Sequence, residues 1–248
     1  MDFLSQNHIF ARLGRKVINR SIIALSKFSK NVYCPICDWK GYRFVYFGRR
    51  KDAQCPKCRS LERHRLQKLV IDKMRIIDFV KGRKVLHFAP EKFFEEIFKK
   101  VADVYISADI QFGRAMIVAD IRNKCFKNNI FSLVYASHVL EHCKKGDDTI
   151  AIREVYRVLK PGGIAILPVP IHRKGGTIEY GFSNREDSGH FRSPGTEYLK
   201  RFKEVGFSLQ VFSSYDFNYQ GRGLLVTKPG FGTFSDYVPV LTKPKIES

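Results

Sequence analysis

Four of the six cysteines in this sequence have the spacing of a metal site. They form two C-x2-C pairs separated by 17 residues: Cys34 and Cys37, then Cys55 and Cys58. Each pair directs two sulfurs toward one ion, and four thiolates complete a tetrahedral zinc site with no position open for catalysis. Two disulfides are the alternative, but nothing in the sequence indicates an oxidising compartment. We therefore predict one structural zinc ion, in preference to iron, in a small ribbon.

A second group of chemically useful residues follows apolar runs later in the chain. From residue 84 onward such runs alternate with helical patterns, which indicates a doubly wound α/β sheet covered on both faces. Ligands bind these sheets at the carboxyl ends of the strands. The first strand ends in "HFAPE", the second at Asp109 and the third at Asp120. Asp109 follows the first turn by about 20 residues, a separation at which a carboxylate accepts the hydroxyls of a ribose.

Residues 129–171 contain the motifs "SHVLEH" and "RVLKPGG". This segment resembles the centre of class I S-adenosylmethionine-dependent methyltransferases of the type 11 group, and the resemblance extends over about residues 84–228. More narrowly, "CPICDW", "CPKCRSLERHR", "VLHFAPE" and "GHFRSPGTEYLKRFKEVGF" resemble bacterial members that carry a zinc ribbon, many of them found in surface-glycan gene sets. The resemblance implies a Rossmann-like domain that binds S-adenosylmethionine.

In that arrangement Asp109 would hold the cofactor ribose, Asp120 and Ile121 would contact the adenine, and the backbone of residues 88–91 would face the methionine part. The candidate cofactor-binding residues are Phe88, Ala89, Pro90, Glu91, Asp109, Ile110, Asp120, Ile121, Ala136 and Ser137.

The turn at residues 87–91 departs from the pattern of the resembled proteins because it contains no glycine. His87 replaces the usual acidic residue, and Ala89 and Glu91 replace the first two glycines. A dinucleotide needs close approach of its pyrophosphate to the backbone, so this turn argues against NAD or FAD. A sulfonium cofactor has no phosphates; Ala89 is small enough to leave it room, and Glu91 would attract its positive charge.

Methyl transfer depends mainly on the alignment of donor and acceptor, and an oxygen acceptor also needs a base. His138 is the leading candidate because it directly follows the fourth strand, with His142 and His190 as the other candidates. Arg192 lies beside His190 in the insertion after the fifth strand, where we expect it to act at the acceptor site. A guanidinium there would suit a phosphate or carboxylate group.

The formal charge of +20 is unevenly distributed. Residues 1–84 contain 21 Lys and Arg against 6 Asp and Glu, whereas residues 85–248 contain 23 against 18. The basic front third favours an anionic partner such as a glycan precursor, RNA or a membrane surface.

The predicted organisation begins with a basic amphipathic segment, residues 1–30, which packs on its own protein or lies peripherally on a membrane surface. A zinc ribbon (31–60), a Rossmann-like methyltransferase domain (61–230, opening with a linking helix over 61–80) and a tail (231–248) follow. The last two strands are expected over 208–215 and 221–230, paired with each other. No apolar run has the length of a membrane span, and the N-terminal segment lacks a signal-peptide core, so we expect a cytoplasmic protein with no transmembrane segment.

These observations predict an S-adenosylmethionine-dependent methyltransferase that acts on a bacterial surface glycan or its lipid-linked precursor. A ribosomal or transfer RNA methyltransferase is the first alternative, since a basic ribbon can contact phosphates. A non-catalytic nucleic-acid-binding adaptor of the same fold is the second, because the first turn is altered.

Overall fold

The computed structural model describes residues 3–171, 174–218, 221–228 and 232–245. The chain divides into two units. The ribbon unit comprises residues 1–69 and 214–236, and the sheet unit comprises residues 70–213 and 237–248. Each unit is therefore assembled from two separate segments of the chain.

The sheet unit is built on a seven-stranded sheet with the order β12-β15-β9-β8-β5-β6-β7. The strands β7, β6, β5, β8 and β9 run parallel, and β15 is antiparallel to both of its neighbours. The bounds are β5 (Lys84–Phe88), β6 (Val104–Asp109), β7 (Ile117–Val118), β8 (Phe131–Ala136), β9 (Leu159–Ile166), β12 (Ser208–Ser213) and β15 (Tyr237–Thr242).

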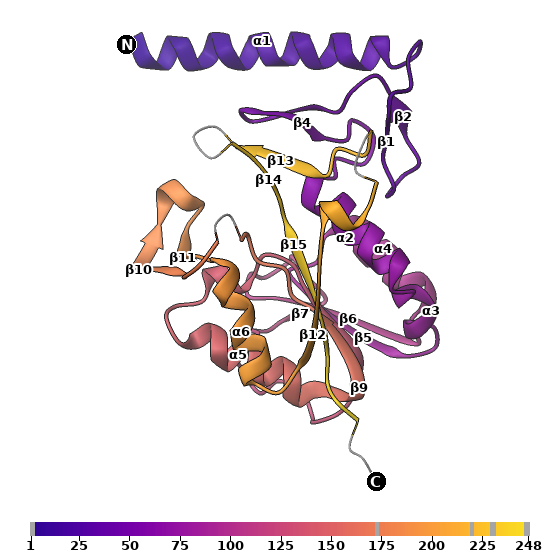
Figure 1. Ribbon diagram of the computed structural model, residues 1–248, viewed down its shortest axis with the longest axis vertical. Helices are drawn as coiled ribbons and strands as arrows, with labels where there is room; N and C mark the ends of the chain where they lie inside the picture. The colour runs from indigo at the N-terminus through magenta and orange to yellow at the C-terminus, as the bar shows by residue number, and fades with distance from the viewer. Residues whose placement is uncertain (1–2, 172–173, 219–220, 229–231, 246–248) are drawn as a thin grey trace. The chain divides into compact units, whose positions relative to one another are not determined.

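Helices flank this sheet, with α3 and α4 on one side and α5 and α6 on the other (Figure 1). A hairpin of β10 and β11 with several short 3₁₀ turns forms the connection between β9 and β12. The bounds are α3 (Ile76–Val80), α4 (Lys92–Val101), η1 (Leu140–His142), α5 (Asp147–Val158), β10 (Ile178–Asn184), η2 (Arg185–Asp187), β11 (His190–Ser193), η3 (Thr196–Leu199) and α6 (Lys200–Glu204).

The central strands are apolar on both faces because both are covered. All six residues of β8 are buried, as are the last four of β5. One core cluster joins the sheet to α5 and α6, and it includes Leu86, Val134, Ile152 and Phe202. Such continuous burial favours the parallel arrangement, and it holds the carboxyl ends of the strands in fixed positions.

The ribbon unit contains a long helix and three small two-stranded sheets. Strands β1 and β2, β3 and β4, and β13 and β14 each pair antiparallel. The bounds are α1 (Phe3–Leu25), β1 (Val32–Tyr33), β2 (Lys40–Gly41), β3 (Val45–Phe47), β4 (Arg50–Gln54), η4 (Ser214–Asp216), β13 (Leu225–Lys228) and β14 (Gly232–Ser235); α2 (Glu62–Lys73) begins in this unit.

The C-terminal half of α1 packs on the ribbon. The Asn19 amide donates to Tyr46 O at 3.3 Å and accepts from Tyr46 N at 2.8 Å, so it pairs with the backbone of β3. Ile22 is buried, and Ser26 Oγ accepts from Tyr42 N at 3.0 Å. Other apolar side chains of the helix remain exposed: Leu13, Val17, Ile18, Ile23 and Leu25. Among the described residues, we find no helix that could span a membrane.

Two predicted elements differ from the structure. The single helix expected over 61–80 is interrupted, because Arg75 adopts a left-handed conformation (φ 52°) between α2 and α3. The expected pairing of 208–215 with 221–230 was wrong. Strand β12 pairs with β15, from the predicted tail, and β13 pairs with β14 in the ribbon unit. The tail thus supplies a strand inside the main sheet, between β9 and β12.

Candidate functional site

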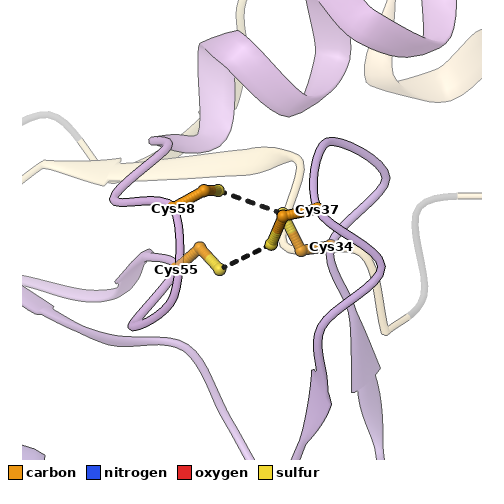
Figure 2. A group of neighbouring side chains, drawn as sticks. All are labelled: Cys34, Cys37, Cys55 and Cys58. Atoms are coloured by element: carbon orange, nitrogen blue, oxygen red, sulfur yellow. Dashed lines mark hydrogen bonds between the residues drawn. The ribbon is translucent and has the colours of Figure 1, made fainter. Parts of the chain in front are cut away.

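The four paired cysteines converge at one point of the ribbon unit (Figure 2). Their sulfurs lie within 4.8 Å of one another, with Cys34 Sγ 3.7 Å from Cys58 Sγ and Cys37 Sγ 3.6 Å from Cys55 Sγ. None of the four forms a disulfide. A tetrahedral ion with bonds of about 2.3 Å separates its sulfurs by about 3.8 Å, so this geometry suits zinc and excludes the disulfide alternative.

The two cysteine pairs have matching backbone geometry. Asp38 N donates to Cys34 O at 3.0 Å, and Arg59 N donates to Cys55 O at 2.9 Å. Asp38 and Arg59 each follow the second cysteine of a pair and have φ near 60°, where glycine is favoured. Burial raises the pKa of the Cys37 thiol to about 11. A bound cation would oppose that effect, because thiolates and not thiols are the ligands.

A pocket of about 380 Å³ opens at the carboxyl ends of the parallel strands in the sheet unit. Its size lies within the range of small-molecule sites. Phe88 and Ala89 line it at the end of β5, and Asp109 and Ile110 line it at the end of β6. His138, shortly after β8, also lines it. The lining residues are Phe88, Ala89, Ala108, Asp109, Ile110, Gln111, Arg114, Ala119, Ile121, His138, Val139 and His142.

Two non-glycine residues that line this pocket have left-handed backbones. Ala89 has φ 47°, and its N–H donates to Ala108 O at 2.9 Å. His138 has φ 55°, and its N–H donates to Pro168 O at 2.9 Å. Such conformations cost about 1–3 kcal/mol each and are concentrated at ligand sites. Ala89 therefore reproduces the turn of the missing glycine, with one added methyl group.

Asp109 lies in the pocket wall, and its Oδ1 accepts from Gln111 N at 2.8 Å. The Asp120 side chain does not line the pocket. Its carboxylate binds Arg122, with Oδ1 2.9 Å from Nε and Oδ2 2.5 Å from Nη2, and Arg122 also pairs with Asp147. The hydrogen bonds from Arg122 hold the pKa of Asp120 below its ordinary value. These contacts leave Ile121 and Ala119 as the pocket residues of this segment.

Glu91 is also engaged within the protein rather than in the pocket lining. Its Oε2 lies 3.2 Å from His87 Nε2, and His87 Nδ1 lies 2.9 Å from Tyr105 Oη. The His87 ring is fully buried and meets the ring of Tyr135 edge to face at 4.9 Å. These contacts hold the turn at residues 87–91 in place. Pro90, Ala136 and Ser137 likewise lie outside the pocket lining.

The three candidate bases lie close together. His138 Nδ1 is 3.0 Å from Glu141 Oε1, and the rings of His142 and His190 meet edge to face at 4.8 Å. Burial disfavours ionisation of Glu141, but the contact with His138 outweighs it and holds the pKa of that carboxyl below its ordinary value. Burial lowers the pKa of His190, which favours its neutral form. His138 and His142 line the pocket, and His190 does not.

Arg192 is fully buried and engaged by protein groups. Its Nη1 donates to Leu140 O at 2.6 Å and its Nη2 to Lys144 O at 3.0 Å. Ion pairs with Asp148 (3.2 Å) and Glu179 (3.1 Å) complete its surroundings. The predicted role of Arg192 at the acceptor is therefore corrected: it fastens β11 to η1 and α5, and its guanidinium has no face toward a ligand.

Sequence reasoning missed five lining residues and the partner of His138: Ala108, Gln111, Arg114, Ala119, Val139 and Glu141. Glu141 lies within the quoted motif "SHVLEH", three residues after His138, so the contact between the two side chains is local in the sequence. Gln111 and Arg114 follow Asp109 in an irregular segment, where no periodicity indicates which side chains face a pocket.

The strand order, the antiparallel β15 and the pocket at the carboxyl edge define a Rossmann-like methyltransferase fold, as predicted. A family model described as a methyltransferase domain matches residues 102–167, and it supports the resemblance stated from the motifs. No curated protein sequence matches the chain.

Solved structures agree on the fold. An S-adenosylmethionine-dependent methyltransferase from Mesorhizobium loti is 15% identical with a TM-score of 0.53, and the match covers 71% of this chain and 97% of that one. A phosphoethanolamine N-methyltransferase from Haemonchus contortus, solved with S-adenosylhomocysteine, is 15% identical (TM-score 0.52; 72% and 53% covered). The [4+2]-cyclase SpnF is 16% identical (TM-score 0.52; 69% and 82% covered). Since one neighbour is a cyclase, the structural similarity shows the fold only, and the reaction must be inferred from the residues of the site.

Proposed function

We propose that the sheet unit binds S-adenosylmethionine in this pocket and transfers its methyl group to an oxygen of a bacterial surface glycan or of its lipid-linked precursor. One observation carries the cofactor proposal. The left-handed residues Ala89 and His138 line a single pocket together with Asp109, at the carboxyl ends of the adjacent parallel strands β8, β5 and β6. The methyltransferase-domain match and the neighbour solved with S-adenosylhomocysteine support it.

The proposed binding mode uses the pocket lining. Asp109 accepts hydrogen bonds from the ribose hydroxyls, and the apolar side chains of Ala119 and Ile121 hold the adenine. The backbone at Phe88 and Ala89 faces the methionine part. Because the cofactor has no phosphates, the methyl group of Ala89 is tolerated where a dinucleotide would need glycine.

When bound, S-adenosylmethionine supplies an electrophilic methyl group on a positively charged sulfur. His138 is placed to accept the proton of an acceptor hydroxyl as the new oxygen–carbon bond forms and the sulfur–carbon bond breaks. Glu141, 3.0 Å from His138 Nδ1, orients the ring and stabilises the imidazolium that results. His138 is the catalytic base in this proposal, and Glu141 is a positioning residue.

Binding tests the cofactor proposal. Calorimetric titration with S-adenosylhomocysteine should show one site per chain. Asp109→Ala should weaken binding at least about tenfold, because each charge-assisted hydrogen bond contributes roughly 1.5–3 kcal/mol. Ala89→Leu should weaken it similarly by filling the pocket.

The matched control is Asp103→Ala, the same substitution at the exposed residue just before β6, at the opposite end of that strand. It should bind as the wild type does. Unchanged affinity in both Asp109→Ala and Ala89→Leu would refute the pocket assignment. The acceptor is tested separately by mass spectrometry of surface glycans from a deletion strain. These glycans should lack a methyl group. Expression of the wild-type protein should restore that group, and expression of His138→Gln should not.

RNA is the second candidate acceptor, and the charge of the ribbon unit favours it. Residues 1–69 and 214–236 contain 18 Lys and Arg against 6 Asp and Glu. A basic surface of this kind binds phosphates with a strong dependence on salt. RNA that copurifies with the protein and becomes methylated in vitro would replace the glycan proposal. Nucleic-acid binding without S-adenosylhomocysteine binding would indicate the adaptor alternative.

A further inference from the structure

A second cluster of metal-ligand side chains lies in the sheet unit, away from the cysteines. Glu141 and His142, at the end of η1, and His190, at the start of β11, each offer a ligand atom, and these atoms lie within 4.8 Å of one another. Two imidazoles and one carboxylate form the ligand set that proteins use for divalent transition metals. This combination is chemically independent of the four-sulfur site.

The carboxylate of Glu141 is the unusual member. Its side chain is fully buried, and neither carboxylate oxygen has a well-aligned hydrogen bond from any described residue. His138 Nδ1 approaches at 3.0 Å. His190 is also buried, and its Nδ1 likewise lacks an aligned partner, although Asp187 Oδ2 lies 3.4 Å away. Glu141 Oε2 and His190 Nδ1 are thus buried polar atoms without an aligned hydrogen bond from a described residue, and an ion or a water is the usual partner of such atoms.

The surrounding fold holds these groups in position. Arg192, two residues after His190 in β11, has its side chain on the same side of the strand and binds Leu140 O and Lys144 O, on either side of Glu141. Its ion pairs with Asp148 and Glu179 reinforce this attachment. The buried and fully hydrogen-bonded Arg192 therefore stabilises the contact between η1 and β11, and this contact keeps His190 facing Glu141.

We propose that Glu141, His142 and His190 bind one divalent transition-metal ion beside the cofactor pocket. Ligands at about 2.0–2.2 Å from an ion lie about 3–3.5 Å from one another, so the cluster needs to close by little more than about 1 Å. His142 is exposed and can supply this movement by side-chain rotation. The other oxygen of Glu141 continues to face His138.

The cluster lies beside the cofactor pocket, so a bound ion would take part in the methyl transfer. This role of the ion rests on the proposed function. His142 lines the pocket as well as the cluster, so open coordination positions would face the acceptor. A bound divalent ion lowers the pKa of a coordinated hydroxyl and orients it. The acceptor class would then be a hydroxyl compound, such as a sugar diol, whose oxygen binds the metal while His138 receives its proton.

The test uses full-length protein whose cysteine site has been filled with zinc. Titration with Co²⁺ should show uptake of one equivalent, with weak visible bands typical of nitrogen and oxygen ligands and no thiolate charge-transfer band. His142→Ala should weaken this uptake at least about tenfold, in line with the loss of a metal ligand. Because His142 is exposed, its replacement leaves the fold intact, and His190→Gln provides a second, independent ligand variant.

Cys125→Ser is the matched control, because Cys125 is an exposed thiol outside both clusters and should not affect uptake. No cobalt uptake, uptake with a thiolate band only, or equal uptake by wild type and His142→Ala would each overturn the proposal. S-adenosylhomocysteine affinity, measured on the same samples, distinguishes failure of the metal site from failure of the cofactor pocket. Wild-type protein that binds S-adenosylhomocysteine but no cobalt would contradict the metal site and leave the cofactor pocket standing.

Discussion

The ribbon unit and the sheet unit each contain a fully buried arginine, but the two guanidinium groups have different kinds of hydrogen-bond partner. Arg192 in the sheet unit has two carboxylate partners, Asp148 and Glu179. Arg65 in the ribbon unit donates instead to backbone carbonyls: Ala53 O, Ser60 O, Arg222 O and Gly223 O, at 2.6–3.1 Å.

The difference indicates what each unit requires in order to fold. Arg65 also stacks on Phe44, at 3.9 Å, and Phe44 belongs to the same small core as Cys34 and Cys55. A zinc ion with four thiolates carries a net negative charge, which would offset the buried guanidinium. The sheet unit has its own carboxylates and a large apolar core. We therefore expect the ribbon unit to depend on its metal and the sheet unit to be stable without it.

Removal of the ribbon metal should have the largest effect. Cys55→Ser, or exhaustive chelation, should unfold the ribbon unit, because structural zinc binding contributes about 10–16 kcal/mol in small zinc domains. Limited proteolysis should cut within residues 31–60 and leave the sheet unit resistant. Elemental analysis of wild type should find about one zinc per chain, and Cys125→Ser should retain it. Metal-free protein with an unchanged melting curve would refute this dependence.

Substitution of the two arginines should separate their roles. Arg65→Met and Arg192→Met should each destabilise their own unit by about 3–5 kcal/mol, since the partners of a buried charge are left unsatisfied. Only Arg65→Met should also weaken zinc retention in a competition with a chromogenic chelator. Equal chelator sensitivity in the two variants would show that the thiolate site does not compensate Arg65.

The sequence predicted best where a local pattern determines the structure. Cysteine spacing located the four-cysteine cluster, and continuous apolar runs located β5, β6 and β8. Long-range choices were not readable. Strand β15 enters between β9 and β12, and residues 221–228 join the ribbon unit, because tertiary contacts and not local propensity select these partners.

Within the candidate site, the sequence predicted residue types that suit the chemistry, but it did not predict which of these side chains reach the pocket. Asp109 and Asp120 both follow strands, yet only Asp109 lines the pocket, because Arg122 engages Asp120. The residue type of Arg192 suits an anionic ligand, but its guanidinium is occupied by buried partners such as Asp148. The left-handed backbones of Ala89 and His138 carry no sequence signal, since neither residue type favours that conformation strongly enough to be predicted.

Acid should destabilise the sheet unit through Glu179. Burial opposes ionisation of this carboxyl, but hydrogen bonds from Arg201 and Arg192 hold its pKa below the ordinary value. A depressed folded-state pKa contributes stability above the unfolded pKa of about 4.3, and that contribution is lost as the pH falls through the folded value. Melting temperature should therefore drop below about pH 4. Arg192→Met should show a shallower drop, and an equally steep one would contradict the assignment.

Reversal of exposed ribbon charges should have the smallest effect on stability. Arg49→Glu with Lys51→Glu changes two exposed residues and spares Arg50, which pairs with Glu62 at 3.2 Å. Each surface charge contributes little to folding, so melting should shift by only about 1 °C or less. Binding to an anionic acceptor or to anionic vesicles should weaken at low salt. Unchanged binding there would show that this patch only promotes solubility.

The central claim is that the sheet unit binds the methyl donor while the ribbon unit serves a structural, metal-dependent purpose. Hydrogen exchange with and without S-adenosylhomocysteine tests it most directly. The account predicts slower exchange at the ends of β5, β6 and β8, around Ala89, Ile110 and His138, with no change in residues 31–60. Protection confined to the ribbon unit, or no protection anywhere in folded protein, would contradict it.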